Sequence, residues 1–144
     1  MTNKIKYSIL FIIINFIFVN AASADEQFNF DVTKVEILEN GNLFKGTDRG
    51  TVTTDNGIII NADNFEYDKI LNILKADGKA EIIDTIENSK IYSDSITYYK
   101  NVEKIFTEGN SKAINNGTII IADKLEHNKI SNIFKATGNA SILD

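Results

Sequence analysis

Few side chains in this sequence are suited to catalysis. His127 is the only histidine among the 144 residues, and the chain has no cysteine. A Cys–His nucleophile pair and a metal site built from several imidazoles are therefore excluded. A Ser–His–Asp arrangement around His127 is formally possible, but the sequence has no G-x-S-x-G motif to present the serine.

Aspartate and lysine recur at a spacing of about thirty residues, at Asp63, Asp94, Asp123, Lys69, Lys100 and Lys129. Catalytic carboxylates normally need different environments that separate their pKa values, whereas equivalent positions of a repeat share one environment. Asp side chains bond nearby backbone N–H groups, so a bend or turn role is predicted for these acids. The lysines are interpreted as solvated turn residues, in preference to a row of cations that contacts phosphates. We expect no enzyme activity, no catalytic residue, no cofactor and no metal.

These residues belong to an internal repeat. Residues 55–84 and 115–144 are near copies, residues 88–115 form a weaker third copy, and a degenerate fourth precedes them with KVEI (34–37) and LFKG (43–46). His127 occupies the position that Tyr67 and Tyr98 fill in the other copies, so it is interpreted as a replacement for an aromatic ring. A repeat architecture is therefore the first fold to consider.

Within each copy, apolar and polar residues alternate. Leu74, Ala76, Gly78, Ala80 and Ile82 share one face of the segment 73–83, with mostly polar residues between them. Alternation is typical of a half-buried strand, and Asn-Gly pairs such as 56–57 and 116–117 mark turns. The pattern predicts an all-β domain over residues 25–144, with about two strands per repeat and about three and a half repeats.

The inner face combines large apolar residues near its ends with Ala, Gly, Ser and Thr at its waist. This composition predicts an apolar groove between two facing antiparallel sheets, because a solid core would fill the waist with larger side chains. A thin sandwich with a filled core is the alternative. The side chains predicted to line the groove are Phe65, Leu74, Ile82, Ile96, Ile105, Leu125, Phe134 and Ile142.

Residues 1–24 resemble a signal peptide. Lys4 and Lys6 precede an apolar run at 8–19, and Ala22 and Ala24 form an A-x-A cleavage pattern. An uncleaved membrane anchor is the alternative. The segment holds two lysines and no acid, so 13 basic and 20 acidic residues remain after it, a net charge of −7. This charge argues against nucleic acid as a partner.

The units IIINADNFEYDKILNILKADGKAEI and IIIADKLEHNKISNIFKATGNASI resemble the repeat of the OstA-like domain family. That family comprises the periplasmic lipopolysaccharide-transport protein LptA and the periplasmic N-terminal part of the outer-membrane assembly protein LptD. The stretch 40–69 is nearer to LptD. An LptD-like protein continues into a transmembrane barrel and this chain stops, so both a fragment and a stand-alone LptA-like protein are left open.

The resemblance implies a V-shaped β-jellyroll whose groove shields the acyl chains of lipid A during lipopolysaccharide transport to the outer membrane. It also implies a periplasmic protein, with association with the outer membrane left open, that pairs with other OstA-like domains through edge strands. A secreted structural or adhesive β-repeat protein, with a filled core and no lipid ligand, shares every strand signal and stays as the alternative.

Overall fold

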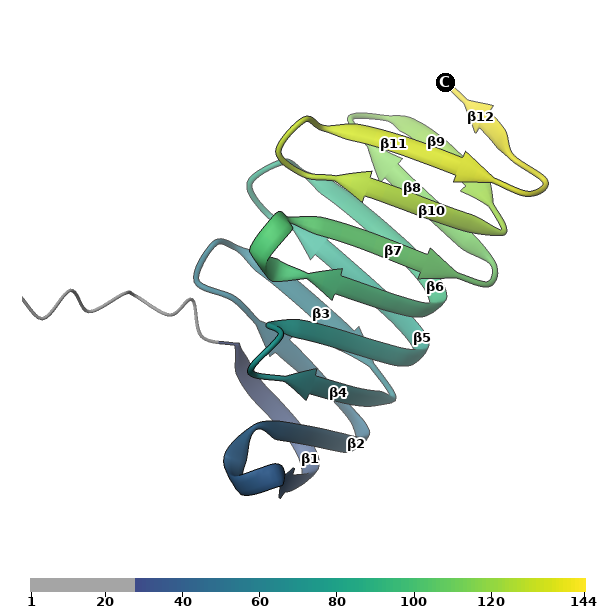
Figure 1. The fold of residues 1–144 in the computed structure, drawn as a ribbon. Coiled ribbons are helices and arrows are strands. Elements are labelled where there is room, and N and C mark those ends of the chain that lie inside the picture. Colours follow the sequence, from purple (N-terminus) through teal and green to yellow (C-terminus); the bar gives the residue numbers. More distant parts are fainter. Residues whose placement is uncertain (1–27) are drawn as a thin grey trace, which may run out of the picture.

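The computed structural model describes residues 28–144, which form one antiparallel sheet of twelve strands (Figure 1). The predicted signal peptide lies outside the described residues. Two short 3-10 turns, η1 (Glu39–Gly41) and η2 (Lys100–Val102), interrupt the strands. The strands are β1 (Asn29–Leu38), β2 (Leu43–Thr53), β3 (Ile58–Ala62), β4 (Asn64–Asp68), β5 (Ile73–Asp84), β6 (Ser89–Tyr99), β7 (Lys104–Glu108), β8 (Ser111–Asn115), β9 (Thr118–Ala122), β10 (Lys124–Asn128), β11 (Ile133–Thr137) and β12 (Ser141–Leu143).

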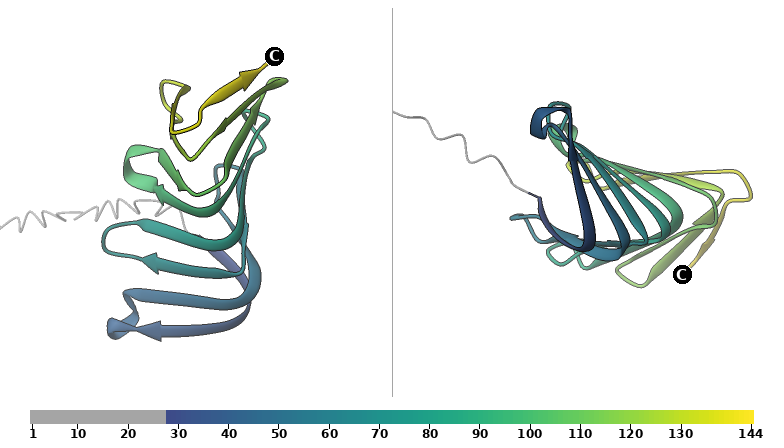
Figure 2. Two further views of the ribbon diagram at one scale, coloured as in Figure 1. Left: turned by 90° about the vertical axis from the view of Figure 1, so that its right-hand side faces the viewer. Right: turned by 90° about the horizontal axis from the view of Figure 1, so that it is seen from below.

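The sheet is bent on itself into two layers that diverge like a V (Figure 2). Layer 1 contains β4, β7, β10 and β11, and layer 2 contains β3, β8, β9 and β12. The long strands β1, β2, β5 and β6 cross the bend and contribute to both layers, since β5 pairs with β4 through one half and with β3 through the other. The predicted all-β V-shaped jellyroll is confirmed, with the difference that one continuous sheet forms both walls.

An Asp–Gly pair forms the bend in each repeat. The Asp63 N–H donates to the Gly78 carbonyl at 2.9 Å, and the equivalent bonds join Asp94 to Gly109 and Asp123 to Gly138. Gly78 has a φ of +82°, and a Cβ on it would lie 2.6 Å from Oδ2 of Asp63. The recurring aspartates therefore lie at a bend, as predicted, and the recurring glycines make room for them. The bonds across the bend are backbone bonds, and the carboxylates accept from the side chains of Arg49, Asn110 and Asn139 in place of the expected backbone N–H groups.

Replacing Gly78 with alanine is expected to destabilise the protein by about 2 kcal/mol, through the positive φ and the clash with Asp63. Gly117 supplies a matched control, because its φ is +92° and no atom beyond its chain neighbours lies within 4 Å of the place that a Cβ would take. Its alanine variant bears only the backbone cost, about 1 kcal/mol. Urea unfolding of the two variants measures the difference, and equal losses would contradict the close contact at the bend.

The space between the layers is filled by side chains from both walls. Val52, Ile58, Ile60 and Ile91 from layer 2 pack with the apolar residues of layer 1, and each is at most 1% exposed. The small waist residues lie beside the bend, where Ser111 bonds Thr107 at 2.6 Å and Ser93 at 3.2 Å. They let the layers approach one another at the bend.

Candidate functional site

Six of the eight predicted groove residues meet in the packed interior. Phe65, Leu74, Ile82, Ile96, Ile105 and Leu125 are each at most 3% exposed and belong to one core cluster. Phe134 is half-buried and packs against the edge of this cluster. Ile142 is 69% exposed, because it lies on β12, which pairs only with β9 among the described strands. A prediction from repeat position alone therefore overestimates how deeply the side chains of the last copy are buried.

The layers separate along the margin opposite the bend, which we call the mouth. In layer 1 the mouth is formed by the turns at 69–72, 100–103 and 129–132, and in layer 2 by those at 54–57 and 85–88. Neighbouring turns of layer 1 are bonded through the backbone, from Lys100 N to the Asn72 carbonyl at 3.1 Å and from Lys129 N to the Glu103 carbonyl at 2.9 Å. The recurring lysine position therefore connects one repeat to the next.

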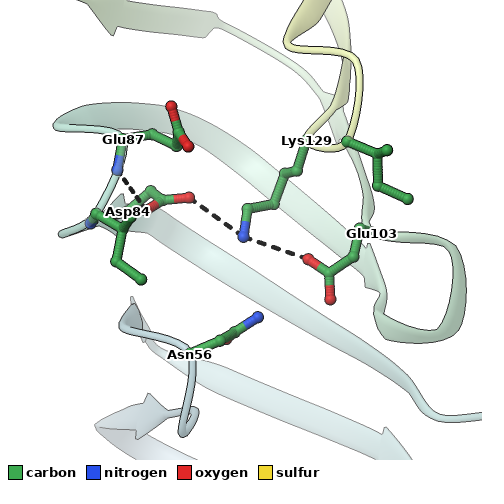
Figure 3. Close-up of a pocket in the computed structure, with 7 residues that line it drawn as sticks. Asn56, Asp84, Glu87, Glu103 and Lys129 are labelled. Carbon is green, nitrogen blue, oxygen red and sulfur yellow. Dashed lines mark hydrogen bonds and ion pairs between the residues drawn. The ribbon is translucent and has the colours of Figure 1, made fainter.

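An ion-paired bridge spans the mouth (Figure 3). The ammonium of Lys129, in layer 1, lies 3.2 Å from Oδ2 of Asp84, in layer 2, and 3.2 Å from Oε2 of Glu103. The Lys129 and Asp84 side chains are only 11% and 5% exposed. They line a pocket of about 190 Å³ together with Asn56, Ile86, Glu87, Glu103 and Ile130.

The expectation of solvated lysines is wrong for two of the three repeat positions. Lys69 is exposed, but Lys100 is 5% exposed and pairs with Glu103, and Lys129 is the bridge across the mouth. Sequence reasoning missed this because Asp84 and Glu103 come from other repeats. The residue type at a repeat position does not reveal an ion-pair partner that is distant in the sequence.

Glu103 is the common partner of Lys100, Lys129 and Tyr98 on the layer 1 side of the mouth. Burial raises the pKa of this carboxyl, but hydrogen bonds from Lys100 and Tyr98 and the charges of Lys129 and Lys100 lower it more, so the net pKa is below the ordinary value. The Tyr98 hydroxyl donates to Oε2 of Glu103 at 2.7 Å. Glu103 is therefore ionised at neutral pH and fixes both lysines in place.

An aromatic cluster closes the N-terminal half of the mouth. The ring of Phe28, which is 8% exposed, lies 4.7 Å from that of Tyr67 and 6.2 Å from that of Tyr98. Phe30 stacks on Phe44 at 6.0 Å. Phe28 precedes the first strand and lies outside the repeat pattern, so no periodic signal in the sequence could have placed it between the layers.

His127 is a buried member of layer 1. Its ring stacks on Phe134 at 3.8 Å, its Nε2 lies 3.3 Å from Oδ1 of Asn132, and its buried Nδ1 finds no hydrogen-bond partner within residues 28–144. Burial lowers the pKa of the imidazole most, and the hydrogen bond with Asn132 opposes it in part. The Lys129 charge lowers the pKa further, and the charges of Asp84 and Glu87 oppose it more weakly, so the net pKa is below the ordinary value. This stacked, apolar setting agrees with the interpretation of His127 as a replacement for tyrosine.

The lowered pKa of His127 predicts a loss of stability on acidification. The unfolded chain binds the proton near pH ~6.5 and the folded chain only at lower pH. The free energy of unfolding should therefore fall as the pH drops below ~6.5, until the pH reaches the folded pKa. His127→Tyr should remove this fall between pH 7.5 and 5.5. Urea titrations at both pH values measure it, and an equal fall in the two proteins would contradict the assignment.

Within residues 28–144, no helix is long and apolar enough to cross a membrane. The same residues contain no group of three or more His, Asp or Glu side chains arranged to hold a metal ion.

Both ends of the described sheet expose strand edges. At one end β1 pairs only with β2, and its Val35 and Ile37 are 52% and 59% exposed. At the other end, β11 pairs with β10 and β12 with β9, and Ile133 and Leu143 are more than half exposed. Unpaired, apolar edges of this kind are suited to pairing with a further strand.

Comparison with known proteins gives a likeness of fold. No family model matches the sequence, and no curated protein matches it. Among solved structures, the fold is similar to that of LptH from Pseudomonas aeruginosa, described as the LptA homologous periplasmic component of the conserved lipopolysaccharide transport device. The TM-score is 0.75 at 13% sequence identity, over 83% of this chain and 95% of LptH.

Proposed function

We propose that this protein is a non-enzymatic periplasmic carrier that shields the acyl chains of lipid A during lipopolysaccharide transport and assembly at the outer membrane. One observation carries the proposal: the two layers enclose a continuous apolar interior that is joined through the backbone at the bend and closed by side-chain contacts at the mouth. A lipid chain can enter such a fold from the side, which a closed barrel does not allow.

The likeness to LptH supports the same proposal, since that protein is described as a component of a lipopolysaccharide transport device. Transfer of an acyl chain needs burial without a covalent step, at ~25 cal/mol per Å² of apolar surface removed from water. Phe65, Leu74, Ile96, Ile105 and Leu125 supply that surface. Ile82 lines the facing wall, and Phe134 and Ile142 extend it toward the C-terminal end.

The exposed edges of β1 and of β11 and β12 provide the partner surfaces of the proposal. Another OstA-like domain would add its edge strand there, so that the apolar interiors of successive domains run on from one to the next. In its more specific form, the proposal is that residues 1–24 export the chain and that it serves as the periplasmic N-terminal domain of an LptD-like protein.

Site-specific photocrosslinking in Gram-negative cells tests the carrier function. A diazirine amino acid of leucine size replaces Leu74, which faces the interior, or Lys75, which faces solvent on the same strand. The proposal expects lipopolysaccharide adducts at 74 and none at 75. No adduct at 74 in a folded, exported protein would reject it.

A structural or adhesive β-repeat protein without a lipid ligand is the second candidate. The observation that favours it is the tight packing of the interior, where six of the eight predicted groove residues are at most 3% exposed. The two candidates differ in one measurable respect, because only the carrier allows an acyl chain to reach Leu74.

A further inference from the structure

The interior is packed so closely that it leaves no room for an acyl chain in this arrangement of the layers. Native interiors are filled to the density of organic crystals, so an acyl chain cannot thread among Leu74, Ile96 and Ile105 while they hold these positions. Room for it requires the two layers to move apart. The bend joins the layers covalently through β1, β2, β5 and β6, so any separation has to occur at the mouth.

Within residues 28–144, two sets of side-chain contacts cross the mouth. In the N-terminal half, Phe28 leaves the layer 2 side and packs on Tyr67 and Tyr98 of layer 1. In the C-terminal half, Lys129 of layer 1 pairs with Asp84 of layer 2. Asp84 is itself fixed, because its Oδ1 accepts the N–H groups of Ile86 at 3.0 Å and Glu87 at 2.9 Å.

Tyr98 connects the two sets. Its ring lies beside Phe28, its hydroxyl donates to Glu103, and the Lys129 ammonium lies 6.0 Å from the ring centroid. The contacts Phe28–Tyr98–Glu103–Lys129–Asp84 therefore form one continuous closure along the mouth, which we call the clasp. Asp84 is buried, Lys129 and Glu103 are partly buried, and the groups of the clasp come from both walls.

Resting on the proposed carrier function, we infer that the clasp is a gate: the protein holds its own mouth shut, and an acyl chain enters only when the Lys129–Asp84 pair and the Phe28 contacts separate. The closed form keeps the apolar interior from water when no lipid is bound. A gate of this kind lowers the apparent affinity for lipid in proportion to the fraction of molecules that are open.

A cross-link across the mouth tests the gate without altering the clasp. Ile86 in layer 2 and Ile130 in layer 1 line the same pocket and are 71% and 78% exposed, so both can be changed to cysteine at the surface. The chain has no native cysteine to interfere. A short bis-maleimide then joins the layer 1 side of the mouth to the layer 2 side in the full-length protein.

The matched control joins two turns within layer 1. Ile70 and Val102 are exposed residues of neighbouring turns, which are connected by the Asn72–Asn101 hydrogen bond at 2.9 Å. Cross-linking Ile70→Cys to Val102→Cys adds the same reagent at the mouth but leaves the layers free to separate. Each double-cysteine protein before cross-linking is its own reference.

The probe is lipid A that carries a dansyl group at the end of one acyl chain, whose emission rises when the chain leaves water. The gate predicts that the Ile86–Ile130 cross-link slows uptake by about tenfold or more, whereas the Ile70–Val102 cross-link leaves it unchanged. Unchanged uptake by the Ile86–Ile130 cross-linked protein would overturn the gate and leave the carrier function standing. Failure of every form to take up the probe, wild type included, would reject the carrier function and the gate with it.

Discussion

Leu74→Asp should abolish cooperative folding. The Leu74 side chain is 1% exposed among apolar neighbours, and a carboxylate there has no cationic partner in the core cluster. Burying an unpaired charge and losing the leucine packing together exceed about 4 kcal/mol, a large part of the roughly 5–15 kcal/mol that stabilises a typical domain. Far-UV circular dichroism during urea unfolding measures the loss.

Two control variants separate burial from charge. Lys75→Asp places the same carboxylate on the exposed face of β5 and should cost less than about 1 kcal/mol. Phe134→Asp should give a folded protein with intermediate loss, because Phe134 is only half-buried near the C-terminal end. Folding of Leu74→Asp with the stability of Lys75→Asp would show an interior open to water at rest, contrary to the packed core described above.

Lys129→Met should destabilise the protein by about 3 kcal/mol. Removing one partner of a buried ion pair leaves the other charge uncompensated, and such changes typically cost about 3–5 kcal/mol. Lys100 still pairs with Glu103 in the variant, so Asp84 is the group left without its cation. The free energy of unfolding from urea titration gives the value.

A double-mutant cycle assigns the loss to the pair across the mouth. Asp84→Asn retains an oxygen for the turn N–H groups but removes the charge, so the double variant should be more stable than the summed single losses predict. Lys124→Met is the surface control, because Lys124 pairs with Glu108 where both side chains are more than half exposed, and it should leave the unfolding midpoint unchanged. Additive losses at 84 and 129 would mean that the bridge contributes nothing to closing the mouth.

Much of the fold could be predicted from period and repeat. Alternation over 73–83 identified β5 and its buried face, and the thirty-residue offsets extended the prediction to Ile96, Ile105 and Leu125. The recurrence of Asp63, Asp94 and Asp123 predicted a bend or turn at these positions, but the pairing of Asp63 with Gly78 was not predicted, because Gly78 was assigned to the inner face of the strand. The features that were predicted are local or repeated, so a single sequence contains enough information to find them.

What could not be predicted depends on contacts between distant residues or on position within the array. Lys129 has the same repeat position as the exposed Lys69, and only the facing turn at Asp84 makes it a buried bridge. Phe28 belongs to no repeat. Ile142 has the pattern of a core residue but lies on the last described strand, where few neighbours remain to cover it.

The proposed gate depends on a difference between the bend and the mouth. The bend is maintained by backbone bonds and tightly fitted glycines, whereas the contacts that cross the mouth within residues 28–144 are side-chain contacts. Side-chain contacts can separate without breaking the ladder of the sheet. In the proposed carrier, this division would let lipid enter and leave while the two layers stay folded.

Entry of an acyl chain between the layers can be observed by nuclear Overhauser spectroscopy of the protein, deuterated and labelled at Leu and Ile methyl groups, with purified lipopolysaccharide. We expect contacts from acyl-chain methylenes to the methyls of Leu74, Ile96 and Ile105, which are sealed in the interior without lipid. Contacts confined to exposed Ile70 and Ile86, or none at saturating lipopolysaccharide, would contradict lipid entry and leave a structural β-repeat protein.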